Sequence, residues 1–190
     1  VITYVLERGH FSPKVINDDF SSEVFDSYLD QLDPLKRYFY QSDFDEFEKF
    51  RFQIDDQLKA YDIAFFNLTY NRLIKRIQES KAIYKEVLAS PFDYSTNEDF
   101  NSDYKNIGYV KNKNQMKERW RQQLKFSNIV NYDDLMTAQE EAKKNNTLVE
   151  PGKATKSNKT VSTDGDKENT IKVERKTLAQ IEKEAREETL

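Results

Sequence analysis

Residue types that could carry out catalysis or bind a metal are scarce in this chain of 190 residues, which holds one histidine and no cysteine. Hydrolysis by a Ser-His-Asp triad would have to use His10, whose Gly9–Pro13 turn lacks the pattern of a nucleophile elbow. We interpret His10 as a surface or interface residue. A zinc site would need three carboxylate ligands for the same reason, so the sequence predicts no metal site.

Serine-lysine and carboxylate pairs offer no better candidate. Ser80 and Lys81 are adjacent within a predicted helix, where neighbouring side chains point about 100° apart and diverge. The same geometry separates the paired carboxylates, which we interpret as helix caps and solvated side chains; the pairs are Asp18 and Asp19, Asp55 and Asp56, and Asp133 and Asp134. The segment 164–169 lacks the ligand order of a calcium loop. We therefore predict no catalytic residue and no cofactor.

The elements that would position any site begin with two helices around a Leu-Asp-Pro turn. Asp18 or Asp19 can cap the first helix, and Pro34 ends it. Ser42 opens the second helix as a variant of the capping box. Apolar residues recur at helical spacing in both helices; they are Phe20, Val24, Phe25, Tyr28, Leu29 and Leu32, then Phe44, Phe47, Phe50 and Ile54.

A helix of about 28 residues is predicted from Asp62 to Ser90. Its expected apolar stripe is Phe66, Tyr70, Leu73, Ile77, Tyr84 and Leu88. Its polar face is interpreted as solvated and comprises Arg72, Lys75, Arg76, Glu79 and Lys85. Residues 92–112 show no period and are predicted to be a loop anchored by its aromatic residues. A further helix begins at Asn114 and runs through Met116, Trp120 and Leu124, and a short separate helix begins at Asp133 or Asp134.

The C-terminal part changes character at residue 144. Residues 144–174 are small, polar and charged and lack aromatic side chains, which favours a flexible linker or insertion. Residues 175–190 outline the start of a charged helix that leads toward downstream domains, through Thr177, Leu178, Ile181, Ala185 and Leu190. The predicted fold is all-α: an irregular helical bundle over residues 1–143 with one long central helix, then the flexible polar linker and the C-terminal helix. Only four Gly and four Pro punctuate the chain, which favours helix over sheet.

Composition places the core in aromatic side chains and argues against nucleic acid as a partner. Hydrophobic residues make up 37% and charged residues 34% of the chain, with thirteen Phe and eleven Tyr. Residues 1–142 hold 19 basic and 25 acidic side chains, a net −6, whereas residues 143–190 hold 11 and 9, a net +2. Trp120 between Arg119 and Arg121 is therefore interpreted as core packing rather than a platform for bases.

The sequence gives no sign of the compartment by composition alone, because the absence of cysteine suits reducing and oxidising environments equally. No stretch approaches the roughly 20 apolar residues that span a bilayer, and no signal peptide is visible. Val1 is not an initiator methionine, which is consistent with removal of an upstream segment.

Over about residues 1–135 the chain resembles the N-terminal helical domain of the tail-specific, or carboxy-terminal processing, proteases. The matching residues occur in collinear order and are Leu6, Glu7, His10, Phe11, Asp18, Asp19, Phe25, Asp26, Tyr28, Leu29, Leu32, Asp33, Tyr38, Phe39, Ser42, Asp43, Phe47, Pro91, Phe92, Asp93, Trp120 and Lys125. Where those relatives carry an Arg followed by Pro-Trp-Pro, this chain has Asp103 to Tyr109.

The resemblance implies a periplasmic protein whose parent is a serine peptidase with a Ser-Lys dyad and a PDZ domain, both outside the matching region. It implies a non-catalytic scaffold or docking domain, with the downstream PDZ and protease domains, protein substrates and an adaptor as partners; contact of its helices with a membrane surface is left open. A free-standing helical interaction module is the alternative. The reading frame after Leu190 separates them, since a PDZ-like segment supports the first and a stop codon the second.

Overall fold

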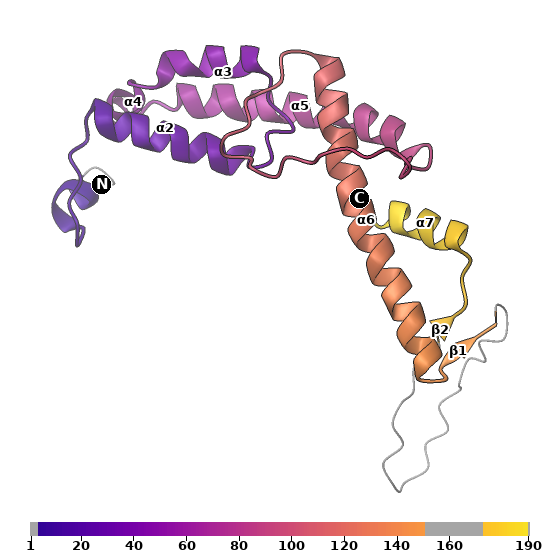
Figure 1. Cartoon of the computed structure of the whole chain (residues 1–190). Coiled ribbons are helices and arrows are strands. Elements are labelled where there is room, and N and C mark those ends of the chain that lie inside the picture. Colours follow the sequence, from indigo (N-terminus) through magenta and orange to yellow (C-terminus); the bar gives the residue numbers. More distant parts are fainter. Residues whose placement is uncertain (1–3, 151–172, 190) are drawn as a thin grey trace, which may run out of the picture. The chain divides into compact units, whose positions relative to one another are not determined.

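The computed structural model describes residues 4–150 and 173–189. It is mostly helical, with two strands of two residues each, so the predicted all-α class is confirmed (Figure 1). The chain forms two units, each from two stretches of sequence. The first unit is Val1–Ala89 with Asn97–Gln122, and the second is Ser90–Thr96 with Gln123–Leu190. The division predicted at residue 143 remains a prediction.

The first unit is built from short and long helices. Their order is η1 (Val5–Gly9), α2 (Asp18–Leu32), α3 (Gln41–Phe47), η2 (Glu48–Phe50), α4 (Ile54–Ala60), α5 (Ala64–Leu88) and the first turns of α6 (Lys113–Lys144). The cap of α2 is Asn17, whose side-chain oxygen accepts from the Phe20 N–H at 3.1 Å. The prediction of Asp18 or Asp19 as the cap is therefore wrong. Both residues lie in the first turn, where a carboxylate interacts favourably with the positive end of the helix dipole.

The second helix of the predicted pair is broken into α3, η2 and α4. Tyr40, not Ser42, precedes the first turn of α3, and its N–H donates to the Asp43 carboxylate at 2.9 Å. The predicted cap is wrong because Asp43, three residues after Tyr40, can reach back to that N–H. Tyr61 then ends α4 in the left-handed conformation, with φ of 56°.

The two long helices differ in how well the sequence located them. The predicted helix from Asp62 to Ser90 is observed as α5, and Asp62 Oδ1 accepts from the Ala64 N–H at 3.1 Å. The break predicted before Asp133 is wrong, because α6 runs unbroken for 32 residues. No Pro or Gly lies between Lys113 and Lys144, and Asp133 and Asp134 project outward from the helix as exposed residues.

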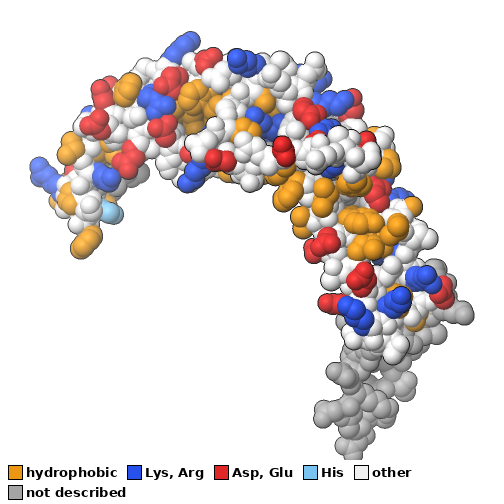
Figure 2. Space-filling view, viewed as in Figure 1, with side chains coloured by type: hydrophobic (Ala, Val, Ile, Leu, Met, Phe, Trp, Pro, Cys, Tyr) orange, Lys and Arg blue, Asp and Glu red, His pale blue; other side chains and the backbone are white. Residues whose placement is uncertain are grey.

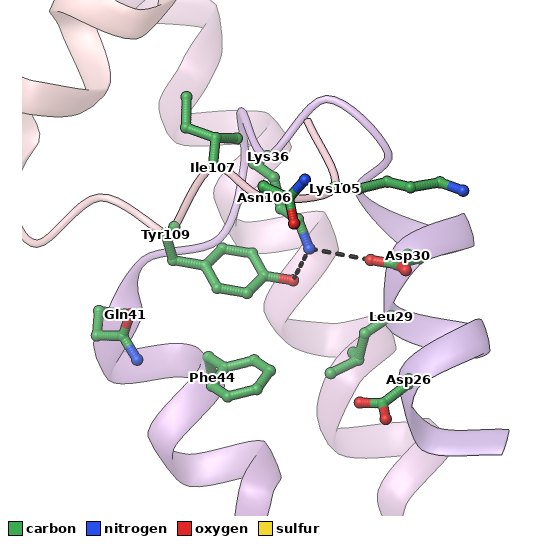
Figure 3. A pocket seen from close by; sticks show the side chains of 11 residues that line it. Asp26, Leu29, Asp30, Lys36, Gln41, Phe44, Lys105, Asn106, Ile107 and Tyr109 are labelled. Atoms are coloured by element: carbon green, nitrogen blue, oxygen red, sulfur yellow. Dashed lines mark hydrogen bonds and ion pairs between the residues drawn. The ribbon is translucent and has the colours of Figure 1, made fainter. Parts of the chain in front are cut away.

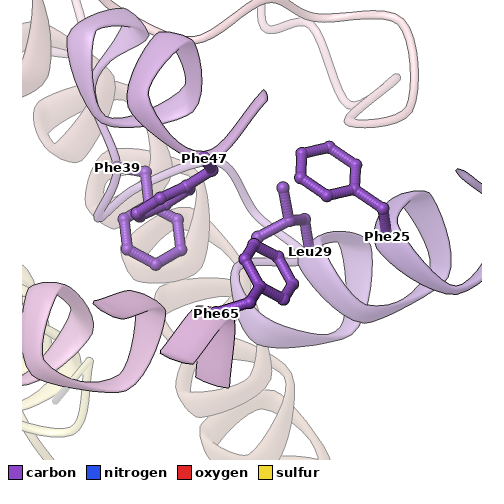
Figure 4. Close-up of a cluster of buried hydrophobic side chains, with 5 residues drawn as sticks. All are labelled: Phe25, Leu29, Phe39, Phe47 and Phe65. Carbon is purple, nitrogen blue, oxygen red and sulfur yellow. The ribbon is translucent and has the colours of Figure 1, made fainter. Parts of the chain in front are cut away.

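The core of the first unit is a cluster of aromatic side chains from α2, the turn after it, α3 and α5. It consists of Phe25, Leu29, Phe39, Phe47 and Phe65 (Figure 4). Phe25 stacks on Phe65 with ring centroids 5.4 Å apart, and Phe39 meets Phe47 edge to face at 5.2 Å. The stripe predicted for α5 is wrong in register at its start, since Phe65 and Thr69 are buried and Phe66 and Tyr70 are exposed.

The second unit joins the remainder of α6 to β1 (Leu148–Val149), β2 (Val173–Glu174) and α7 (Leu178–Glu187). The strands pair in parallel, with Leu148 opposite Val173. Thr177 caps α7 by accepting from the Gln180 N–H, and Ile181 and Ala185 are its buried residues. The linker predicted for 144–174 thus has paired strands at its ends, and residues 151–172 lie outside the described residues.

Candidate functional site

The residues that the sequence singled out for catalysis lie apart from one another. His10 is exposed, and its Nδ1 lies 2.8 Å from the Ser12 carbonyl oxygen. Ser80 is buried and its hydroxyl donates to the Ile77 carbonyl at 2.8 Å, within the same helix. Lys81 is exposed, on a different side of α5 from its buried neighbour. Ser80 and Lys81 therefore do not converge into a dyad.

A serine, a carboxylate and a lysine do meet between α2 and α4. Ser21 Oγ donates to Asp55 Oδ1 at 2.7 Å and accepts from the Asp55 backbone N–H at 2.8 Å. Lys59 Nζ donates to Asp55 Oδ2 at 2.7 Å. These hydrogen bonds, from Lys59 first and then from Ser21, lower the pKa of Asp55.

This group cannot act on a substrate, because Ser21 is 0% exposed and its hydroxyl is engaged both as donor and as acceptor. It instead connects α2 to α4. The sequence prediction for Asp55, a cap or solvated carboxylate, is wrong, since Asp55 is buried; Asp56 is exposed as predicted. Ser21 lies one helical turn before Phe25 and so shares the buried face of the helix. That spacing was the signal in the sequence that the Ser21 hydroxyl would need a polar partner.

Asp43 is the centre of a second buried polar group, which joins α3 to α5. Its side chain is 0% exposed and accepts hydrogen bonds from Arg72, from Arg76 Nε and Nη2 at 2.8 Å each, and from the Tyr40 N–H. Glu46 and Glu79 each contact one of the two guanidiniums at 2.6 Å. The Arg76 guanidinium also lies over the Tyr40 ring, 4.4 Å from its centroid.

The electrostatics of this group favour the ionised form of the Asp43 side chain. Burial alone would raise the pKa of Asp43, but the hydrogen bonds from Arg76, Tyr40 and Arg72 outweigh it and hold that pKa below its ordinary value. The interpretation of Arg72 and Arg76 as part of a solvated face is therefore wrong, because the two arginines reach across to a buried anion, whereas Glu79 is exposed as predicted. Lys75 and Lys85 are exposed as predicted.

The free energy of unfolding should depend on pH through Asp43. The unfolded chain binds more protons than the folded chain in the acidic range, because the folded pKa is lowered. The contribution of Asp43 to stability is complete above the ordinary aspartate pKa of about 3.9 and is lost as pH falls through the folded pKa.

Urea unfolding from pH 6 to pH 3 should therefore show a falling free energy of unfolding, with a shallower dependence on pH in Asp43→Asn. Asp45→Asn, an exposed carboxylate of the same helix, is the matched control; equal slopes in wild type and Asp43→Asn would contradict the assignment.

Asp33 organises the turn after α2. Its buried carboxylate accepts from three successive backbone N–H groups, those of Arg37, Tyr38 and Phe39, at 2.9 to 3.0 Å. Lys36 takes the left-handed conformation, with φ of 49°. This turn places Phe39 in the core and presents the Lys36 and Arg37 carbonyls to α6. Arg119 donates to the first at 2.7 Å and Trp120 Nε1 to the second at 2.9 Å.

A groove of about 410 Å³ opens beside this turn, between α2, α3 and the segment 105–109 (Figure 3). Its lining residues are Asp26, Leu29, Asp30, Lys36, Gln41, Phe44, Lys105, Asn106, Ile107, Gly108 and Tyr109. Tyr109 stacks on Phe44 with ring centroids 5.2 Å apart. The adjacent Val110 carbonyl accepts from the Gln41 N–H at 2.8 Å. The aromatic anchoring predicted for the loop 92–112 is therefore observed at Tyr109.

Three charged side chains that line the groove, Asp26, Asp30 and Lys36, are engaged in ion pairs. Lys36 Nζ donates to Asp30 at 3.0 Å and to the Tyr109 hydroxyl at 3.3 Å, and Asp26 pairs with Arg51 at 2.8 Å. Burial lowers the pKa of Lys36, but the hydrogen bonds to Asp30 and Tyr109 outweigh it and the pKa is raised. Burial raises the pKa of Tyr109. Lys36 therefore stays a cation and Tyr109 a neutral phenol, and neither is prepared to act as a base or nucleophile.

Other kinds of site have no support in the described ranges. Residues 4–150 and 173–189 contain no group of three or more His, Asp or Glu side chains placed to hold a metal ion. None of the helices in those ranges combines the length and the apolar character that crossing a membrane requires. Figure 2 shows acidic and basic side chains interspersed over the face in view rather than gathered into a field of one sign.

Two further residues of the sequence resemblance meet in the second unit. Lys125 is buried, and its ammonium donates to the Asp93 carbonyl oxygen. The Tyr94 hydroxyl donates to Asn128 Oδ1, and burial raises the pKa of Tyr94 to about 12. These contacts fasten the segment 90–96 onto α6.

Comparison with known proteins identifies the family of this chain. Residues 2–189 match the model of the tail specific protease N-terminal domain. The chain belongs to this family. A tail-specific protease of Haemophilus influenzae is 35% identical over 75 residues, which are 39% of this chain. The aligned part spans only 11% of the length of that protease.

Proposed function

We propose that this chain is a non-catalytic scaffold and docking domain of a periplasmic tail-specific protease, a serine endopeptidase that processes proteins from their carboxy termini. The observation that supports the proposal best is where the family-matching residues lie. Phe25, Leu29, Phe39 and Phe47 lie in the core, and Trp120 is buried in the same unit. These apolar residues of the match therefore build the fold.

Two polar residues of the match, Asp33 and Asp43, serve the fold in the same way. Asp33 caps the turn that follows α2, and Asp43 joins α3 to α5. Neither has an exposed side chain, since both are 0% accessible to solvent. Buried carboxylates that are fully engaged with arginines and backbone N–H groups fix the positions of helices and do not turn over a substrate.

In this proposal the Ser-Lys dyad and the PDZ domain are supplied by other parts of the same polypeptide. The helix α5 is the long rigid element against which those parts can rest. Protein substrates and an adaptor are the remaining partners. The acidic balance of residues 1–142 makes nucleic acid an unsuitable one.

The proposal predicts that this chain alone does not cleave peptides. A fluorogenic peptide with an apolar carboxy terminus should remain intact in its presence, because Ser21, which has Asp55 and Lys59 beside it, is buried, and because Lys125 near the exposed Ser95–Asp93 pair is engaged with the Asp93 backbone carbonyl. The full-length parent protease is the positive control. Turnover that survives repurification and is abolished by Ser21→Ala or Ser80→Ala would overturn the proposal.

A further inference from the structure

One face of α5 carries apolar side chains that are exposed in this structure. Ile63, just before the helix, and Phe66, Tyr70 and Ile74 within it are 59%, 49%, 48% and 39% exposed. They follow one another at intervals of three and four residues and so lie along one stripe of the helix. The Phe66 and Tyr70 rings stack with centroids 5.8 Å apart. Such a continuous apolar stripe, rather than a single exposed residue, is typical of a protein contact.

The same helix is basic in its second half. Lys75, Lys81 and Lys85 are exposed, and none of them has an acidic partner within ion-pair distance among residues 4–150 and 173–189. In contrast, Glu79 pairs with Arg76 and Glu86 with Lys117. The acidic side chains of this half of α5 are thus taken up by other cations, which leaves the three lysines as a net positive surface.

We propose that this face of α5, defined by Ile63, Phe66, Tyr70, Ile74, Lys81 and Lys85, docks an acidic amphipathic helix of a partner protein. A helix laid along it would meet apolar side chains over the first three turns and ammonium groups over the last turns. The distance from Ile63 to Lys85 is about 33 Å along the helix axis, which a partner helix of about 22 residues would span. Apolar residues at one end and glutamates or aspartates at the other are the complementary pattern.

The charge distribution favours such a helix over a membrane surface. Asp62, the residue before Ile63, is exposed at the apolar end of the stripe, where anionic headgroups would be repelled. Residues 1–142 carry a net charge of −6 in total. A partner with its own acidic and apolar ends can match this polarity, whereas a uniformly negative surface cannot.

This inference deepens the proposed docking role and rests on it. The probe is a synthetic 22-residue helix with four leucines at the spacing of the stripe and glutamates over its last two turns; its twin carries lysines in place of the glutamates. Fluorescence anisotropy of each labelled peptide with the 190-residue chain gives the two affinities. The acidic peptide should bind at least about tenfold more tightly than its twin, and added salt should weaken the binding of the acidic peptide.

Charge exchange gives the sharpest result. Lys81→Glu/Lys85→Glu should lower the affinity for the acidic peptide about tenfold and raise the affinity for the lysine twin. Phe66→Ser/Tyr70→Ser should lower the affinity for both peptides. Lys49→Glu/Lys111→Glu and Phe52→Ser change exposed residues elsewhere and should leave both affinities unchanged. Circular dichroism and the unfolding midpoint establish that each variant is folded.

Three outcomes would overturn the inference: equal binding of the two peptides, charge exchange without effect, or binding to phosphatidylglycerol vesicles that the α5 substitutions abolish. The first two would leave the proposed scaffold role intact, since that role is tested separately by the absence of peptide cleavage. Cleavage of the fluorogenic peptide would overturn the scaffold role, whatever affinities the two synthetic helices show.

Discussion

Asp43→Ala is expected to lower the free energy of unfolding by about 3 kcal/mol. The substitution leaves the Arg72 and Arg76 guanidiniums facing one another with no anion between them, and it removes the acceptor for the Tyr40 N–H. The estimate is at the lower end of the range for broken buried ion pairs, because both arginine side chains are partly exposed, at 22% and 16%, and can turn toward water.

Urea denaturation of wild type and variant measures this loss. Glu46→Ala is the matched control, since Glu46 pairs with the same Arg72 but is 39% exposed, and its removal should cost less than about 1 kcal/mol. Equal losses for Asp43→Ala and Glu46→Ala would mean that the buried carboxylate does not hold α3 to α5.

Trp120→Ala is expected to destabilise the chain by about 3 to 5 kcal/mol, as a large truncation in a packed core. The indole is 4% exposed and meets Tyr38 edge to face at 5.9 Å, and the Arg37 guanidinium lies over its ring at 4.8 Å. The substitution also leaves the Arg37 carbonyl without the donor that Trp120 Nε1 provides.

Two controls separate packing from hydrogen bonding at this position. Trp120→Phe retains most of the ring volume and should cost about 1 to 2 kcal/mol, largely through the lost donor. Phe52→Ala removes an aromatic side chain that is 56% exposed and should change the midpoint little. An unchanged midpoint for Trp120→Ala would show that the indole is a surface contact.

The helices and the aromatic core were accessible to sequence reasoning wherever one signal dominated. The length of α5 followed from an unbroken helical period between Asp62 and Pro91, and Trp120 was correctly assigned to the core. The predicted register of α5 is wrong because Phe65 and Phe66 are adjacent, so that either could begin the stripe. Thr69 decides it: it is buried one turn after Phe65 and its hydroxyl donates to the Phe65 carbonyl.

The polar interior could not be predicted, because it depends on contacts between residues far apart in sequence. Arg72 and Arg76 have the spacing of an ordinary solvated helix face, and only the packing of α3 against α5 brings Asp43 between them. Ser21 and Asp55 are separated by 34 residues and are likewise joined only by the fold. The break between α3 and α4 was missed because the apolar spacing continues across it through Phe47 and Phe50.

The order in which the chain is made has a consequence for the first unit. The carbonyl of Arg37 receives its donor from Trp120, which is synthesised 83 residues later. At a translation rate of about 5 to 20 residues per second, the turn held by Asp33 waits roughly 4 to 17 seconds for that indole. During this interval the nascent polypeptide exposes apolar surface that its own later segment will cover.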